Sequence, residues 1–159
     1  MVLSIPAFHV SDTSSVDGDG QVVVASRKDA TTSHGTFDVK ISVHFLPADP
    51  YPTGNVSMQV SLTDGLNGAY RSTLIELINS YGVVNPTVYM AGRCTVDPGP
   101  GVKAPLGLRF WLMIVQNKAK DEAGTPDIVG FAVHDHTGKR VAYGTGPVRG
   151  QGAFTVKAE

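Results

Sequence analysis

The sequence predicts an all-β protein with one short helix, folded as an antiparallel two-layer β-sandwich of the jelly-roll or immunoglobulin-like kind. The main observation is that Thr36–Phe45 and Val56–Thr63 alternate apolar and polar residues without error. Successive side chains of a strand point to opposite faces of a sheet. Each segment therefore buries one face and leaves the other in solvent, as strands of antiparallel sheets do. A closed β-barrel is the alternative arrangement.

Composition agrees with a single β-sandwich domain spanning residues 1–159. Charged residues make up 17% of the chain and hydrophobic residues 42%, whereas disordered chains combine low hydrophobicity with high net charge. The 18 glycines and 10 prolines follow no period, which excludes a collagen-like chain and favours many strands joined by turns. We expect roughly eight or nine strands, close to a jelly roll.

One further segment is apolar on both phases of a strand. In Leu106–Val115 both odd and even positions are mostly apolar, which predicts a central strand covered on both faces, with Trp111 in the core. Glycine and aspartate in Ser11–Gly20 predict a loop, and Asp17–Gly20 favours an Asx/Gly turn over a calcium site. Phe154–Lys157 repeats the alternating pattern, and strands with weaker signals are expected at Ile5–Val10, Gln21–Ser26 and Thr87–Val96.

A hairpin is predicted near the C-terminus. Ile128–Asp135 is followed by a short polar turn, and Arg140–Tyr143 returns antiparallel to it. Gly138 suits the turn because glycine adopts positive φ without a Cβ clash.

The expected helix covers Thr73–Tyr81. Thr73 and Glu76 fit a capping box, and Gly82 is placed to end the helix. Apolar residues at i, i+3, i+4 and i+7 would form one stripe on its surface: Leu74, Leu77, Ile78 and Tyr81.

Charge and segment lengths exclude several classes of partner. The 13 basic and 14 acidic residues leave a net charge of −1, which argues against a nucleic-acid or membrane-surface binder. No apolar run approaches the roughly 20 residues of a membrane-spanning helix, so membrane insertion is not expected. The N-terminus lacks the basic region of a signal peptide, and Cys94 is the single cysteine. These features predict a cytoplasmic protein, with a secreted mature form as the alternative.

His134 and His136 are the candidate metal ligands. Residues i and i+2 of a strand share a face, so two imidazoles at this spacing can chelate one divalent ion. A catalytic zinc site takes three protein ligands, and the third would come from His9, His34, His44 or an aspartate. The alternative is that both rings lie at the solvated end of the hairpin. Apart from this metal, no cofactor is predicted.

Tyrosines provide the candidate binding residues. Amphipathic aromatic side chains suit sugar stacking and protein interfaces. Tyr51, within Pro50–Pro52, and Tyr143 are the two selected from the aromatic residues.

The function predicted from these observations is non-enzymatic binding or assembly, as in a lectin-like, adhesin-like or coat-type module. The sequence has no Gly-x-Ser-x-Gly elbow, and Gly144–Arg149 lacks the third glycine of a dinucleotide fingerprint. The expected partner is a second copy, another protein or a glycan, with no nucleic acid. One alternative is a metal-assisted or acid–base enzyme using His134 and His136. The other is a barrel that binds or isomerises a small apolar ligand.

Overall fold

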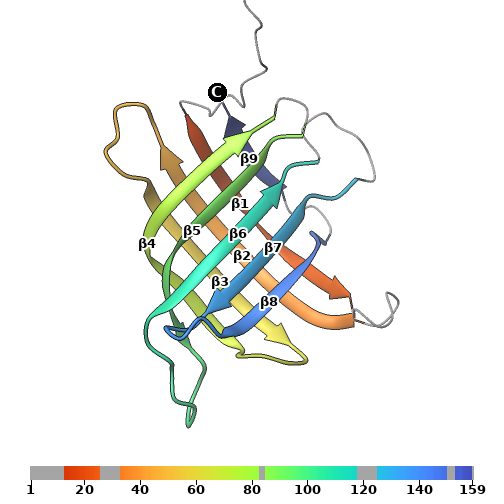
Figure 1. Cartoon of the computed structure of the whole chain (residues 1–159). Coiled ribbons are helices and arrows are strands. Elements are labelled where there is room, and N and C mark those ends of the chain that lie inside the picture. The colour runs from red at the N-terminus through yellow and green to blue at the C-terminus, as the bar shows by residue number, and fades with distance from the viewer. Residues whose placement is uncertain (1–12, 26–32, 83–84, 118–124, 150–152, 159) are drawn as a thin grey trace, which may run out of the picture.

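The computed structural model describes residues 13–25, 33–82, 85–117, 125–149 and 153–158. These ranges form nine strands (Figure 1), and no helix in them is long and apolar enough to cross a membrane. The strands are β1 (Ser14–Ala25), β2 (Ser33–Phe45), β3 (Thr53–Leu62), β4 (Gly68–Tyr81), β5 (Thr87–Asp97), β6 (Leu108–Val115), β7 (Ile128–His134), β8 (Arg140–Pro147) and β9 (Ala153–Ala158).

All nine strands belong to one antiparallel sheet. Its order is β8-β7-β6-β5-β4-β3-β2-β1-β9, so each strand from β1 to β8 pairs with its neighbour in sequence, and β9 adds to the free edge of β1. The predicted all-β class and its antiparallel pairing are confirmed. The strands expected at Thr36–Phe45, Val56–Thr63, Thr87–Val96 and Phe154–Lys157 and the hairpin ending at Arg140–Tyr143 are found in β2, β3, β5, β9 and β7–β8.

The sheet curls until its two ends approach each other. Val22 of β1 forms a bridge with Val148 just after β8, and the Arg149 amide donates to the Gln21 carbonyl oxygen at 2.7 Å. In Figure 1 the strands β4 to β8 lie in front of β1 to β3. The predicted two-layer sandwich is not confirmed, because one curled sheet faces itself across the core. The closed-barrel alternative is partly compatible with this shape.

Inward side chains fill the space inside the curl. The rings of Phe37 on β2 and Phe131 on β7 meet edge to face, with centroids 4.6 Å apart. Such contacts join the opposite halves of the sheet and add to the hydrophobic stabilisation of the core. The largest fully buried side chains are those of Tyr70, Phe37, Phe110, Phe154, Met90 and Leu108.

The predicted helix at Thr73–Tyr81 is wrong, because this segment is the second half of β4. The register between β4 and β5 shifts at Ser72/Leu74 and again at Ile75/Leu77. Each bulge adds one residue to the strand, so its inward positions become three residues apart instead of two. The outward positions are also stepped by three, as in Leu74 and Leu77, so the predicted stripe combined these two exposed residues and Tyr81 with the buried Ile78.

The predicted loop at Ser11–Gly20 is also wrong for its described part. β1 begins at Ser14, and Asp17–Gly20 pairs with β2 instead of turning, with Asp17–Asp19 also paired with β9. Gly18 takes a φ of 148° within the strand. The predicted strand Gln21–Ser26 is the end of β1 as far as Ala25, whereas Ile5–Val10 lies outside the described residues.

Side chains satisfy the outer edge of β9. The Phe154 amide donates to Asp127 Oδ2 at 3.0 Å, and the Val156 amide donates to Gln116 Oε1 at 2.7 Å. Asp127 is fully buried, and its other carboxylate oxygen accepts from the Asn117 amide. Two side chains thus accept the hydrogen bonds that a further strand would accept. Leaving these buried amides unpaired would lower the stability of the fold.

Candidate functional site

The outer surface of β4–β8 is the least expected part of the molecule. Cross-strand neighbours place Leu77, Ala91, Trp111, Ala132 and Tyr143 in one row over five strands. The solvent side of an ordinary antiparallel sheet is polar, yet this row is apolar or aromatic throughout. We call this surface the aromatic face, defined by its large exposed residues Leu74, Leu77, Tyr81, Tyr89 and Trp111.

Trp111 lies at the centre of the aromatic face, so its predicted core position is wrong. Its residue is 62% exposed. On β6 the even-numbered residues from Leu108 to Ile114 fill the core, and Trp111 has the opposite phase. All nine described strands lie in one sheet, so no described strand forms a second layer over it. Among the described residues, the strands of the sheet therefore cover the doubly apolar β6 on its inner face only.

Two tyrosines extend the aromatic face toward the end of β4. The rings of Tyr81 and Tyr89 are stacked, with centroids 5.7 Å apart and planes at 23°. The hydrogen bond between these side chains raises the pKa of Tyr81. This pair offers a flat, amphipathic surface at the solvent boundary, which is the kind of surface aromatic residues provide at interfaces.

A second row, which we call the basic row, borders the aromatic one. Arg93, Arg109, His134 and Arg140 are cross-strand neighbours on β5, β6, β7 and β8. Like charges placed directly opposite one another destabilise a sheet. Arg140 lies 3.7 Å from the centre of the Tyr143 ring, a cation–π distance. The basic row therefore concentrates positive charge beside exposed aromatic rings.

Glu76 partly neutralises the basic row. It is the extra residue in the second bulge of β4, which directs it to the outer surface. Its Oε1 atom is 3.6 Å from Arg93 Nε and 4.0 Å from Arg109 Nη1. Both arginine side chains are more than half exposed, so these long ion pairs contribute little to stability. One carboxylate is thus shared by two arginines.

A groove of about 580 Å³ runs over the junction of the two rows. Its floor is formed by β5 and β6, and the turn between β7 and β8 forms one wall. The polar and aromatic side chains that line it are Thr73, Arg93, Thr95, Arg109, Trp111, His134, Asp135 and His136. This combination of one indole ring, two guanidinium groups and two hydroxyls is the best-equipped candidate binding site that we describe.

The two predicted metal ligands, His134 and His136, both line this groove. His134 ends β7 and is half-buried, whereas His136 is exposed in the turn. Among the described residues there is no group of three His, Cys, Asp or Glu side chains that could hold a metal. Arg109 and Arg140 flank His134 in the basic row, and positive neighbours oppose cation binding. The metal site stays a prediction.

Asp135, between the two histidines, stabilises the turn. Its Oδ1 atom accepts from the Thr137 hydroxyl at 2.6 Å and from the amides of Thr137 and Lys139 at 2.9 and 3.0 Å. The hydrogen bond from the Thr137 side chain is the largest influence that lowers the pKa of Asp135. This carboxylate is therefore engaged as a turn cap.

The two predicted binding tyrosines lie in different places. Tyr51 is 72% exposed in the loop between β2 and β3, as a displayed residue would be. Tyr143 is half-buried on the aromatic face beneath Arg140. Neither lines the groove. The residues that sequence reasoning missed, Arg93 and Arg109, share a phase with their apolar neighbours on the same strands, and only the register shows that they are opposite each other.

The outer surface of β1–β3 is polar, and we call it the polar face. Its outward side chains include Asp17, Asp38, Lys40, Ser42 and Gln59. Ser42 donates to Asp17 Oδ1 at 2.7 Å, and His44 Nε2 lies 3.0 Å from the same oxygen. Burial raises the pKa of Asp17, but these hydrogen bonds outweigh it and the net pKa is lowered.

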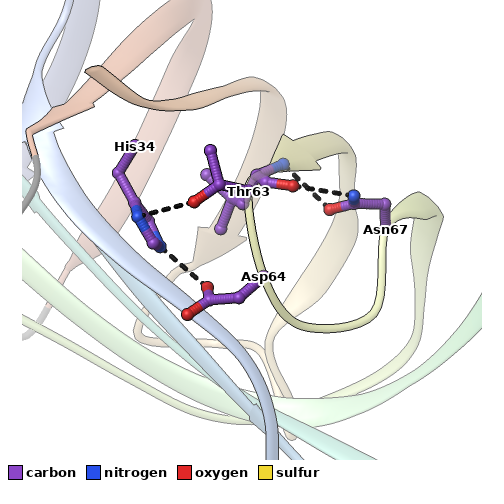
Figure 2. A network of polar contacts seen from close by, with 5 residues as sticks. His34, Thr63, Asp64 and Asn67 are labelled. Carbon is purple, nitrogen blue, oxygen red and sulfur yellow. Dashed lines mark hydrogen bonds and ion pairs between the residues drawn. The ribbon is translucent and has the colours of Figure 1, made fainter. Parts of the chain in front are cut away.

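A second histidine cluster links β2 to the turn after β3. Figure 2 shows the His34 ring between Thr63 and Asp64. Thr63 Oγ1 is 2.8 Å from Nδ1, and Asp64 Oδ1 is 2.7 Å from Nε2. A hydroxyl, an imidazole and a carboxylate in line resemble a catalytic relay in their order, but the carboxylate is 65% exposed and such catalysis relies on excluding water. We interpret the cluster as a structural link.

Two further observations bear on the enzyme and apolar-ligand alternatives. Burial raises the pKa of the Cys94 thiol to about 12, so it stays protonated at neutral pH and is a poor nucleophile. Apolar residues also gather at one end of the sheet, where Leu66, Ala104 and Leu106 line a cleft of about 730 Å³. This cleft lies between loops at the surface and not within the core.

Comparison with protein-family models, with curated proteins and with solved structures finds no match for this chain. The site must therefore be interpreted from its own geometry.

Proposed function

We propose that this protein works by binding or assembly, without catalysis, and that the aromatic face is the surface that receives the partner. A second copy, another protein and a glycan are all partners of suitable chemistry. The exposure of Trp111 supports the proposal most strongly, because a large indole ring in the middle of a strand is usually buried against other residues of the protein or against a binding partner. A contiguous exposed apolar surface is typical of interaction sites.

Charge distribution supports the same surface. Protein and ligand interfaces favour tryptophan, tyrosine and arginine, and all three types meet on the aromatic face and its basic border. The polar face carries serine, aspartate, lysine and glutamine instead. The two outer surfaces therefore differ in the residue types that distinguish an interface from ordinary solvated surface.

The test combines light scattering after size exclusion, at low and high protein concentration, with binding to a glycan array. We expect either concentration-dependent oligomers or bound glycans, and we expect Trp111→Thr/Leu77→Thr to abolish whichever is seen. Gln59→Thr, an exposed substitution on β3 of the polar face, is the matched control and should leave binding unchanged. A protein that stays monomeric and binds no glycan and no protein partner overturns the proposal.

A further inference from the structure

We propose that the groove between the basic row and the aromatic face binds an acidic saccharide. Its sugar ring would lie on Trp111, and its carboxylate or sulfate group would be held by Arg93 and Arg109. This inference rests on the proposed function and names the ligand class for one part of the aromatic face.

The first observation is the unbalanced positive charge of the basic row. Arg93 and Arg109 face each other across β5 and β6, with Glu76 at 3.6 and 4.0 Å, and the Asp135 carboxylate in the same groove is already bound by the Thr137 and Lys139 amides. His134 continues the row on β7. This placement costs stability in the free protein, and an anion bound between the guanidinium groups would remove the repulsion. Two guanidinium forks match the oxygens of a carboxylate or sulfate.

The second observation is the position of the indole ring relative to this charge. Arg109 and Trp111 are two residues apart on the outer face of β6, which separates their Cα atoms by about 7 Å. That spacing suits a pyranose ring on the indole with its charged substituent on the arginine. Thr73 and Thr95 line the same groove, and their hydroxyls can donate to or accept from sugar hydroxyls.

The extent of the charge favours a saccharide over a nucleic acid. A phosphate backbone is bound by a continuous basic track, and the affinity grows with the number of phosphates neutralised. Here the basic row is short and is partly neutralised by Glu76, and the whole chain has a net charge of −1. One anionic group beside a ring is the charge that Arg93 and Arg109 complement, since Glu76 and Asp135 offset part of the positive charge.

The test uses isothermal titration with a hyaluronan tetrasaccharide, a heparin disaccharide and neutral chitotetraose, with adenosine monophosphate as a further probe. We expect one of the acidic saccharides to bind at least about tenfold more tightly than chitotetraose. Added sodium chloride should weaken that binding. Trp111 is the single tryptophan, so saccharide binding should also change the intrinsic fluorescence of the protein.

Variants of the two arginines test binding of the anionic group separately from the contact between the sugar ring and Trp111. Arg109→Gln and Arg93→Gln should each weaken the acidic saccharide about tenfold or more and leave chitotetraose unaffected. Lys40→Gln removes one positive charge from the polar face and is the control, expected to change nothing. Thermal melts establish that each variant is folded, and agreement between the two arginine variants guards against a local structural effect.

Several outcomes would overturn this inference. Equal affinity for neutral and acidic sugars, no effect of either arginine variant, or a preference for adenosine monophosphate would each contradict it. A dimer that loses its stability in Trp111→Thr and binds none of the saccharides would show a second copy on the face. These results would leave the proposed binding function standing, whereas a monomer that binds none of the probes, no glycan and no protein partner would remove both proposals.

Discussion

The two outer surfaces of one sheet differ sharply in this protein. The polar face on β1–β3 has the polar composition expected of a solvent-exposed surface, with side chains such as Ser42 and Lys40 alternating with buried ones. The aromatic face on β4–β8 keeps the same alternation of direction, but exposes Trp111 and Tyr89. Inward residues of both halves are equally apolar. The inward residues thus indicate the fold, and the outward residues indicate whether each surface faces solvent or a binding partner.

Backbone irregularities also gather on the aromatic side. β4 contains two register shifts against β5, and the pairing of β7 with β8 shifts at Val133/His134. In the other half the shift lies at the end of β1, at Val24/Ala25. Bulges redirect side chains and are frequent next to functional sites. Here one of them places Glu76 between the two arginines.

The largest predicted effect is the difference in stability between substitutions on the inner and outer faces of β4. Ile78 is 6% exposed and Leu77 is 47% exposed. Ile78→Ala should lower the free energy of unfolding by about 3 kcal/mol because it leaves a cavity in the core, and Leu77→Ala by about 0.5 kcal/mol. Urea denaturation of both variants measures the difference. Equal losses would mean that the aromatic face is part of a buried core.

The next largest predicted effect is on the quenching of Trp111 fluorescence by ions, which depends on the charge around the ring. Iodide should quench the fluorescence of this single tryptophan more efficiently than caesium does, because the basic row attracts the anion. Arg109→Gln should reduce the preference for iodide, and Lys40→Gln should not. Stern–Volmer plots at constant ionic strength provide the measurement. Weak quenching by both ions would show that Trp111 is covered.

A smaller effect is expected on the polar face. Ser42→Ala removes a hydrogen bond that lowers the pKa of Asp17, so that pKa should rise toward the ordinary value of 3.8. Because the folded-state pKa is depressed, the stabilising contribution is present above 3.8 and is lost as the pH falls through the lower folded value. Carboxyl NMR titration of both proteins measures the shift. A pKa that does not move would show that His44 alone holds the carboxylate.

The smallest effect is local to the turn beside the groove. Thr137→Ala removes the hydroxyl donor to Asp135, so the depressed pKa of Asp135 should rise. The amide donors of Thr137 and Lys139 remain, and the rise should therefore be partial. The same NMR titration follows it, with Asp17 as an internal reference that stays constant. A full return to 3.8 would indicate that the turn itself has opened.

Much of the fold follows from the sequence, because period-two alternation in β2 and β3 depends on local geometry alone. The helix prediction failed at β4, since two bulges convert a period of two into steps of three that imitate a helix. The loop prediction at Ser11–Gly20 failed because glycine and aspartate in β1 pair with strands on both sides. Long-range pairing overrides local propensity in both cases.

The candidate site was only partly predictable. The sequence led to His134 and to the aromatic residues, but it placed Trp111 in the core because a doubly apolar strand is usually covered on both faces. Arg93 and Arg109 lie 16 positions apart in the chain, and only the pairing of β5 with β6 brings them opposite each other. Which residues lie opposite each other depends on the register of the strands, and the register is set by turn lengths and bulges.

The hydrogen bonds from Gln116 and Asp127 to β9 determine how a partner can approach. Many β proteins recruit peptides by letting them extend a sheet at an open margin, and open margins also promote fibrous aggregation. Along this margin the amides of Phe154 and Val156 are already taken by side chains. Recognition by backbone addition is thereby disfavoured at β9, where a ligand or a second molecule would be recognised through side chains instead.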